Sequence, residues 1–108
     1  MLVSVILTVK NEESNIASCL TSLLNQSVID LEIIIVDDQS IDNTVSIINS
    51  FKDSRIQLFT IYSKEHDGHS NRRNYALGKS NGKYIFFTDG DCIPHYNWIA
   101  EGLKVFQE

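Results

Sequence analysis

Two pairs of acidic residues, each placed at the end of an apolar run, could bind a metal ion. Asp89 and Asp91 stand on either side of Gly90, and Asp37 is followed directly by Asp38. Carboxylates one residue apart on a turn can converge on a hard cation such as Mg²⁺, which leaves its other positions to water and phosphate oxygens. An Asp-Gly turn and a helix cap are the structural alternatives. Each pair taken alone leaves both interpretations open.

The elements that must position these acids alternate between strands and helices. Short β-branched apolar runs predict buried strands, whereas apolar residues spaced three and four apart, such as Ile16, Leu20 and Leu23, predict helices. The predicted strands are residues 2–8, 31–37, 56–62 and 83–88, and the predicted helices are residues 10–26, 42–52, 70–80 and 97–106. This alternation predicts an α/β fold, a doubly wound, mostly parallel sheet with flanking helices.

Polar residues and glycines mark the ends of the predicted helices. Asn11 is expected to cap the first helix, and Glu12 and Glu13 suit the positive end of its dipole. Asp42 is expected to open the second helix. Gly82 is expected to stop the third helix, because glycine costs least at a C-terminal position.

In a doubly wound sheet, ligands bind beyond the carboxyl ends of the strands, where the loops emerge. The loops at that edge are residues 8–11, 37–42, 63–70 and 89–94. Both acidic pairs fall there, and their joint placement favours a functional site over two unrelated turns. Arg72 and Arg73 follow the third loop and could supply cations, although a helical arginine is more often a solvated surface residue.

The composition fits one globular domain spanning residues 1–108. The chain has 43% hydrophobic and 21% charged residues and a net charge of −5. This acidic balance argues against nucleic acid as a partner, which would require a basic surface. For a diphosphate ligand, a cation held by the acidic pairs would offset the unfavourable field. Cys19 and Cys92 match no zinc spacing and are interpreted as buried, reduced thiols of a cytosolic protein.

Several motifs for nucleotide binding and catalysis are absent from the sequence. No GxGxxG follows the first strand, no GxxxxGK[ST] occurs, and neither HExxH nor GxSxG is found. The first loop, "TVKNEES", is too poor in glycine to wrap a pyrophosphate. Any nucleotide must therefore be held in another way.

Four stretches of the chain resemble, in order and spacing, the start of the inverting family-2 glycosyltransferases of the GT-A fold. They are "VSVILTVKNEESNIASCLTSLLNQ", "LEIIIVDDQSIDNT", "GHSNRRNYAL" and "GKYIFFTDGDCIP", and together they cover nearly the whole chain. The resemblance implies the Rossmann-like nucleotide-binding half of that fold. It also implies a site for a nucleoside-diphosphate sugar, usually a UDP-sugar, with Mg²⁺ or Mn²⁺ as cofactor.

The resemblance assigns roles to individual residues. Thr8 is similar to the strand-end residue that lines the nucleoside pocket, and Asp38 is similar to the acid that hydrogen-bonds the base. Arg73, in an Arg-Asn pair, is similar to the arginine near the base and phosphates. Asp89 and Asp91 resemble the family's Asp-x-Asp motif, in which Asp89 lies towards the ribose and the metal, and Asp91 binds the metal.

The chain departs from the family pattern at three positions. Many relatives have Pro-Thr-x-Asn after the first strand, so the resemblance places Asn11 with the nucleotide-sugar-binding residues while Lys10 is unusual. Gln39 stands where glycine is common. Cys92 stands where a further acid often follows.

From the resemblance we expect the donor-binding half of a metal-dependent hexosyltransferase that transfers a sugar to an acceptor hydroxyl with inversion. The catalytic base is unknown and is expected beyond Glu108, with the acceptor-binding half of a longer enzyme. One alternative is a nucleotide-sugar-binding module without turnover. A second is a sugar nucleotidyltransferase, which would want a first loop rich in glycine and lysine.

The family's part in polysaccharide and glycolipid assembly implies a saccharide or lipid-linked acceptor. It also implies a cytoplasmic protein, peripheral at the inner face of the membrane in the full enzyme. An exposed edge of the sheet would favour a homodimer, because unpaired strand edges tend to pair with another chain.

Overall fold

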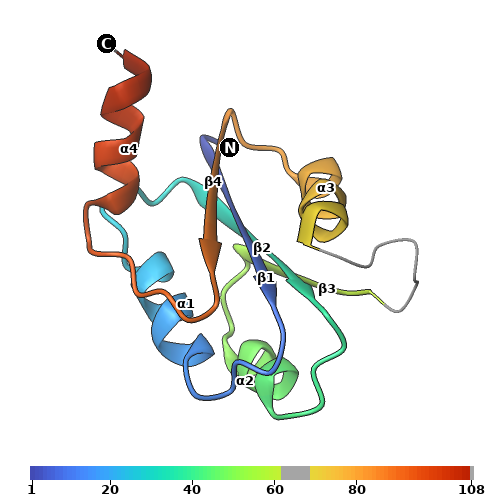
Figure 1. The fold of residues 1–108 in the computed structure, drawn as a ribbon. Coiled ribbons are helices and arrows are strands. Elements are labelled where there is room, and N and C mark those ends of the chain that lie inside the picture. The colour runs from blue at the N-terminus through green and yellow to red at the C-terminus, as the bar shows by residue number, and fades with distance from the viewer. Residues whose placement is uncertain (62–68, 108) are drawn as a thin grey trace.

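The computed structural model describes residues 1–61 and 69–107, in which strands and helices alternate along the chain (Figure 1). The strands are β1 (Val3–Val9), β2 (Leu31–Asp37), β3 (Ile56–Thr60) and β4 (Tyr84–Asp89), and the helices are α1 (Ile16–Leu24), α2 (Thr44–Ser50), α3 (His69–Lys79) and α4 (Trp98–Gln107). All the elements that the sequence predicts are present.

The four strands form one parallel sheet in the order β3-β2-β1-β4. Every residue of β2 is buried, and so is every residue of β1 except the half-buried Thr8. Strands covered on both faces are apolar almost throughout, which explains the continuous hydrophobic runs at 3–9 and 31–37. The predicted α/β class and parallel sheet are confirmed.

Helices cover both faces of the sheet, as Figure 1 shows. One core cluster joins α1, α2 and α4 to the sheet and includes Ile16, Ile48 and Ile99. A smaller cluster on the opposite face joins α3, through Ala76, to the inner strands, where it meets Ile34. The fold is therefore doubly wound.

A buried carboxylate anchors the chain between α3 and β4 to the sheet. Glu32 is 1% exposed and accepts hydrogen bonds from Ser4 Oγ at 2.5 Å, the Asn81 backbone N–H at 2.6 Å and Gln57 Nε2 at 3.1 Å. Gly82 N–H donates in turn to Ser4 Oγ. Burial alone would raise the pKa of the Glu32 carboxyl, but the hydrogen bonds outweigh it and lower the pKa below its ordinary value.

The predicted helix ends need correction. Asn11 does not cap α1, which begins five residues later at Ile16, and Glu12 and Glu13 precede its first turn. Asn11 has φ 52° instead, in the left-handed region that asparagine tolerates, and its Oδ1 accepts the backbone N–H of Ile41. Its side chain therefore serves the loop after β2 rather than the helix.

Other boundaries also differ from prediction, and two of the differences have a clear physical reason. β3 ends at Thr60 rather than at residue 62, because its partner β2 ends at Asp37, which pairs with Thr60. α3 ends at Lys79, before Gly82. A Cβ on Gly82 would collide with the backbone of β1 at Ser4 and Val3, so close strand packing, not helix termination, requires glycine there.

Among the helices that the structure describes, none has the length and apolar character needed to cross a membrane.

Candidate functional site

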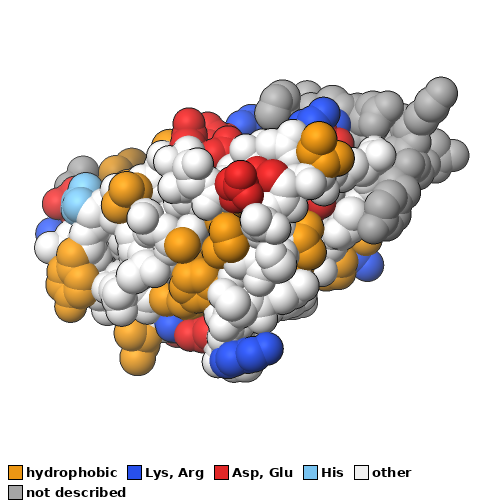
Figure 2. Space-filling model, turned by 90° about the horizontal axis from the view of Figure 1, so that it is seen from below, with side chains coloured by type: hydrophobic (Ala, Val, Ile, Leu, Met, Phe, Trp, Pro, Cys, Tyr) orange, Lys and Arg blue, Asp and Glu red, His pale blue; other side chains and the backbone are white. Residues whose placement is uncertain are grey.

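The candidate site lies at the carboxyl edge of the sheet, the edge viewed in Figure 2, where acidic side chains gather near the middle of the face. Its backbone frame is set by strand pairing. Thr8 of β1 lies beside Val36 of β2 and beside Asp89 of β4. The loops that follow these strands therefore leave the sheet next to one another.

A cavity of about 330 Å³ opens at this edge. It is lined by residues from the ends of β1 and β4, the loops after β1, β2 and β4, and the first turn of α3. They are Thr8, Val9, Lys10, Glu12, Asp38, Arg72, Asp89, Gly90 and Asp91. The lining combines carboxylates with two cationic side chains, as an anionic ligand bound together with a cation would need.

Asp38 is held by two cations at one of its oxygens. Arg72 Nη2 lies 2.7 Å from Asp38 Oδ2, and Lys10 Nζ lies 3.9 Å from the same atom. Asp38 and Arg72 are largely buried, at 13% and 12% exposed, whereas Lys10 is 63% exposed. The arginine pair is thus the shielded contact, and the lysine contact is the weaker, solvent-screened one.

Asp37, the neighbour of Asp38, belongs to the frame of the site. It is 1% exposed, and its carboxylate accepts the Ser40 Oγ–H at 2.5 Å and the Ser40 backbone N–H at 3.2 Å. An aspartate side chain that bonds the residue three positions later in this way stabilises the conformation of a loop. Asp37 therefore has a structural role in the loop, whereas Asp38 lines the cavity.

The loops after β1 and β2 are joined by reciprocal hydrogen bonds. Asn11 N–H donates to Ser40 Oγ, and Glu12 N–H donates to Thr44 Oγ1 at 2.8 Å. In the other direction, Ile41 N–H donates to the Asn11 side chain at 2.8 Å. The remaining cross-loop bonds link Glu13 N–H to Asp42 Oδ2 and Asn43 N–H to Glu13 Oε2. One side of the cavity is therefore a single preorganised unit.

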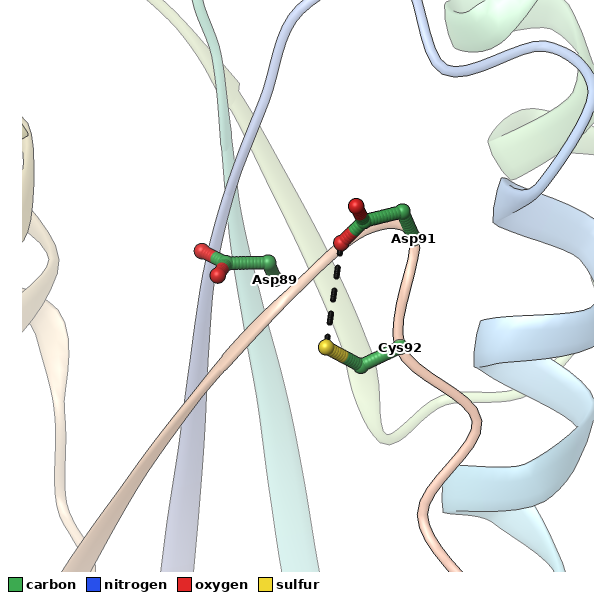
Figure 3. A group of neighbouring side chains, drawn as sticks. All are labelled: Asp89, Asp91 and Cys92. Atoms are coloured by element: carbon green, nitrogen blue, oxygen red, sulfur yellow. Dashed lines mark hydrogen bonds between the residues drawn. The ribbon is translucent and has the colours of Figure 1, made fainter.

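The Asp-x-Asp turn brings three potential metal ligands together (Figure 3). Asp89 ends β4, Asp91 and Cys92 follow on the turn, and one ligand atom of each lies within 4.8 Å of the others. The Cys92 backbone N–H donates to the Asp89 carbonyl at 3.1 Å and closes the turn. Asp91 Oδ1 accepts a hydrogen bond from the Cys92 thiol at 3.7 Å. The two carboxylates are exposed, and such a pair fits a hard divalent cation such as Mg²⁺ or Mn²⁺.

Side chains from β1 and α1 pack closely against this turn. Gly90 is buried, and a Cβ at this position would lie 2.8 Å from Val9 Cγ1. The Cys19 thiol of α1 donates to the Asp89 carbonyl at 3.5 Å. Burial, and to a lesser degree the negative charges nearby, raises the pKa of Cys19 to about 12, so this thiol is a neutral structural donor.

Four of the predicted site residues lie together: Thr8, Asp38, Asp89 and Asp91 all line the cavity. Asn11 and Arg73 lie outside its lining. Asn11 is exposed and engaged with the β2 loop, and the Arg73 guanidinium lies 5.5 Å from the centre of the Phe87 ring. Their roles in nucleotide-sugar binding remain predictions.

Arg72, which the sequence offers only as one of two possible cations, is the arginine that lines the cavity. Successive residues on a helix point about 100° apart, so Arg72 and Arg73 leave α3 in different directions. The motif favoured Arg73, whereas in the structure Arg72 is the one that lines the cavity. Lys10, noted only as unusual, and Glu12 also line it. Residues 63–68 of the predicted third loop, like residue 62 of the predicted third strand, lie outside the described residues.

Comparison with known proteins identifies the family. The family model for glycosyl transferase family 2 matches residues 4–108. The Escherichia coli protein UDP-Glc:alpha-D-GlcNAc-diphosphoundecaprenol beta-1,3-glucosyltransferase WfgD is 39% identical over 105 residues, covering 96% of this chain and 39% of that protein. The chain spans about a third of the length of the curated relatives that it matches.

Solved structures agree with this assignment. TarS 1–349 of S. aureus superposes with a TM-score of 0.87 at 25% identity, covering 99% of this chain and 32% of that one. The mannosyltransferase PcManGT from Pyrobaculum calidifontis, solved with GDP-Man and Mn²⁺, superposes with a TM-score of 0.84 at 26% identity, covering 98% and 32%. Since the family model matches nearly the whole chain, the protein belongs to glycosyltransferase family 2.

Proposed function

We propose that this chain binds the nucleoside-diphosphate sugar donor of a metal-dependent, inverting hexosyltransferase. One observation carries the proposal: the Asp-x-Asp carboxylates and Asp38, which lie far apart in sequence, line the same cavity at the carboxyl edge of the sheet. Relatives named for UDP-Glc and solved with GDP-Man act on or bind donors of this class. A cavity lined by acids and cations suits a diphosphate that arrives with a divalent cation.

The residues at the turn would hold the cation. Asp91 would be the principal ligand, and Asp89 would contact both the metal and the ribose. A relative solved with Mn²⁺ supports Mn²⁺ or Mg²⁺ as the cofactor. When bound, the cation neutralises charge on the diphosphate and so stabilises the departing nucleoside diphosphate.

The other cavity residues would orient the donor. Thr8 and Asp38 contact the nucleoside, and the buried loop frame keeps Asp38 in place. An acceptor hydroxyl then attacks the anomeric carbon from the face opposite the diphosphate, so that the configuration inverts. The base that deprotonates this hydroxyl is a carboxylate supplied from outside this chain.

The acceptor and location follow as further parts of the proposal. A relative named for a diphosphoundecaprenol-linked substrate supports a saccharide or lipid-linked acceptor. Such an acceptor would place the full enzyme at the cytoplasmic face of a membrane, as a peripheral protein.

Binding of a nucleotide sugar without turnover is the second candidate function, because the residues that line the described cavity are assigned to the donor and its cation and none of them is assigned as a base. Whether the chain itself supplies a catalytic base can be measured. Incubation of the chain with UDP-sugars, GDP-sugars and Mn²⁺ should give neither transfer nor hydrolysis if the base lies elsewhere. Turnover by the chain alone would contradict that assignment.

Calorimetric titration tests the donor site directly. Nucleoside diphosphates and their sugars should bind with Mn²⁺ and at least about tenfold more weakly without it, since the diphosphate then meets uncompensated carboxylates. Asp91→Asn should abolish this metal dependence without changing the circular dichroism spectrum. Asp30→Asn, at an exposed position away from the cavity, is the matched control. Nucleotide binding that does not depend on the metal, or the absence of nucleotide binding, would contradict the proposal.

A further inference from the structure

Cys92 places a sulfur atom beside the two carboxylates of the Asp-x-Asp turn. Its thiol donates to Asp91 Oδ1 at 3.7 Å, and one ligand atom each of Asp89, Asp91 and Cys92 lies within 4.8 Å of the other two (Figure 3). Two metal–ligand bonds of about 2.0–2.3 Å together span nearly this distance. Small rotations of these side chains would therefore bring two oxygens and one sulfur onto a single ion.

The position of this sulfur leaves it open to an ion from solvent. Cys92 is exposed and lines the second cavity, whereas Cys19 is buried and its thiol donates to the Asp89 carbonyl. Asp89 lines both that cavity and the one that holds the other candidate site residues. Cys92 thus stands where the two cavities meet, on the opposite side of the turn from Asp38.

We propose that Cys92 is a specificity-determining residue of the cation site. Its thiolate would be a protein ligand beside Asp89 and Asp91, and it would favour Zn²⁺ or Co²⁺ over Mg²⁺. This inference rests on the proposed function, because the cation is the one that the donor diphosphate requires. As the cation binds, the S–H bond of Cys92 breaks, its proton passes to water, and a sulfur lone pair forms the bond to the metal, whose oxidation state is unchanged.

The preference follows from the chemistry of the three ligand atoms. Mg²⁺ is a small, hard cation that takes oxygen ligands and water, so a thiolate adds little to its binding. Zn²⁺ and Co²⁺ accept both carboxylate and thiolate ligands, and Zn²⁺ binds thiolates strongly. A sulfur ligand therefore stabilises the complexes of Zn²⁺ and Co²⁺ selectively.

Family membership leaves the identity of the cation open. One relative was solved with Mn²⁺, at 26% identity to this chain. Divalent cations bind a given site with affinities that rise from Mn²⁺ to Co²⁺ and beyond, whether its ligands are oxygen, nitrogen or sulfur. The contribution of Cys92 is therefore measured as a change between the wild type and a variant, not from the wild-type order alone.

Cobalt spectroscopy tests for the sulfur ligand directly. A thiolate bound to Co²⁺ gives an intense charge-transfer band in the near ultraviolet, which carboxylate ligands do not give. Co²⁺ is titrated into the chain with and without UDP, in a phosphine reductant that contributes no thiol of its own. We expect the band to appear and to saturate with Co²⁺. Cys92→Ser should lose it, although Cys19 is still present.

Calorimetry with Zn²⁺, Co²⁺ and Mg²⁺ measures the selectivity. Cys92→Ser should weaken the binding of Zn²⁺ and Co²⁺ at least about tenfold, and should change that of Mg²⁺ by less than about threefold. Cys92→Asp, which replaces the sulfur by an oxygen ligand, should lose the cobalt band and bind Mg²⁺ at least as tightly as the wild type.

His95→Gln is the matched control, because it removes another common metal ligand from the same loop. It should keep the cobalt band and the wild-type affinities. Thermal unfolding of each variant checks the fold, and Cys92→Asp carries the test if Cys92→Ser does not fold.

The possible failures are separable. If no divalent cation supports nucleotide binding, the proposed function fails and this inference fails with it. If Co²⁺ supports nucleotide binding without the charge-transfer band, Cys92 is not a ligand and the donor site stands. The same conclusion follows if Cys92→Ser keeps the affinity for Zn²⁺, or if His95→Gln lowers that affinity instead.

Discussion

Asp37 and Asp38 show how neighbouring residues of one type acquire different roles. Asp37 ends β2 within the sheet and bonds the loop backbone, while Asp38 has left the strand and meets Arg72 in the cavity. No feature of the neighbouring sequence distinguishes the two aspartates. Only the end of strand pairing separates the two.

The two cysteines should differ sharply in reactivity. Cys19 is fully buried, and burial raises its pKa to about 12, whereas Cys92 is exposed on the Asp-x-Asp turn. In the native protein, Ellman's reagent should react quickly with one thiol, that of Cys92. It should react with the second thiol, that of Cys19, only after unfolding. Cys92→Ser should remove the fast phase, and two fast thiols would contradict the buried placement of Cys19.

At the residue scale, the sequence predicts chemistry better than it predicts orientation. Thr8, Asp38, Asp89 and Asp91 could be anticipated because strand ends in a parallel sheet lie at one edge. Arg72 could not, since its selection over Arg73 depends on the rotation of α3 against the sheet. That rotation follows from packing around Ala76, which no local pattern encodes.

At the scale of elements, the alternation of strands and helices was predictable and their ends were not. The interior of β1 and β2 is apolar because both faces are covered. The start of α1 depends instead on bonds between the loops after β1 and β2, which draw Asn11 away from the helix. Hydrogen bonds between segments about thirty residues apart cannot be predicted from the sequence pattern of either segment alone.

Two glycines in the segment from α3 to β4 should respond oppositely to alanine. Gly82→Ala would force a Cβ against the β1 backbone, and we expect a loss of about 2 kcal/mol or more in the free energy of unfolding. Gly78→Ala lies in α3 with open space around its Cβ, so a gain of roughly 0.5–1 kcal/mol is expected from helix propensity. Urea denaturation of the pair measures both, and equal effects would refute the close contact at Gly82.

The Glu32 anchor should make stability depend on pH. Because the folded-state pKa of Glu32 is lowered, the unfolded state binds its proton first, so the stabilisation is present above the ordinary pKa of 4.5 and is lost as pH falls through the folded value. Glu32→Gln keeps the volume but turns an amide towards hydrogen-bond donors. We expect a loss of about 2 kcal/mol at pH 7.

Urea denaturation at several pH values checks this prediction. The difference in unfolding free energy between wild type and Glu32→Gln should shrink as pH falls below the ordinary pKa of 4.5 and through the lowered folded-state pKa. A difference that stays constant with pH would mean that the charge of Glu32 does not stabilise the fold.

At the scale of the whole molecule, the described sheet has open edges at β3 and β4. Beyond β4, a second cavity is lined partly by Phe87, Ile93 and Trp98, and Ile93 is 68% exposed. An unpaired strand beside exposed apolar side chains is a surface prone to association. The homodimer expected from the sequence remains a prediction.

Sedimentation velocity tests for self-association. The apparent mass should rise with protein concentration, and Ile93→Lys should reduce this rise by placing a charge beside the open edge. Ile41→Lys is the matched control, since Ile41 is 93% exposed but belongs to the loop after β2. If both variants behave like the wild type, β4 is not the associating edge.

The bonds between the loops after β1 and β2 also limit how this protein can be re-engineered. Asn11 needs Ser40 and the backbone of Ile41, while Glu13 needs Asp42 and Asn43. Grafting only one loop from a relative would leave these partners mismatched. Segments 10–13 and 40–44 therefore form one exchangeable cassette, and chimaeras should keep their fold only when both halves come from the same parent.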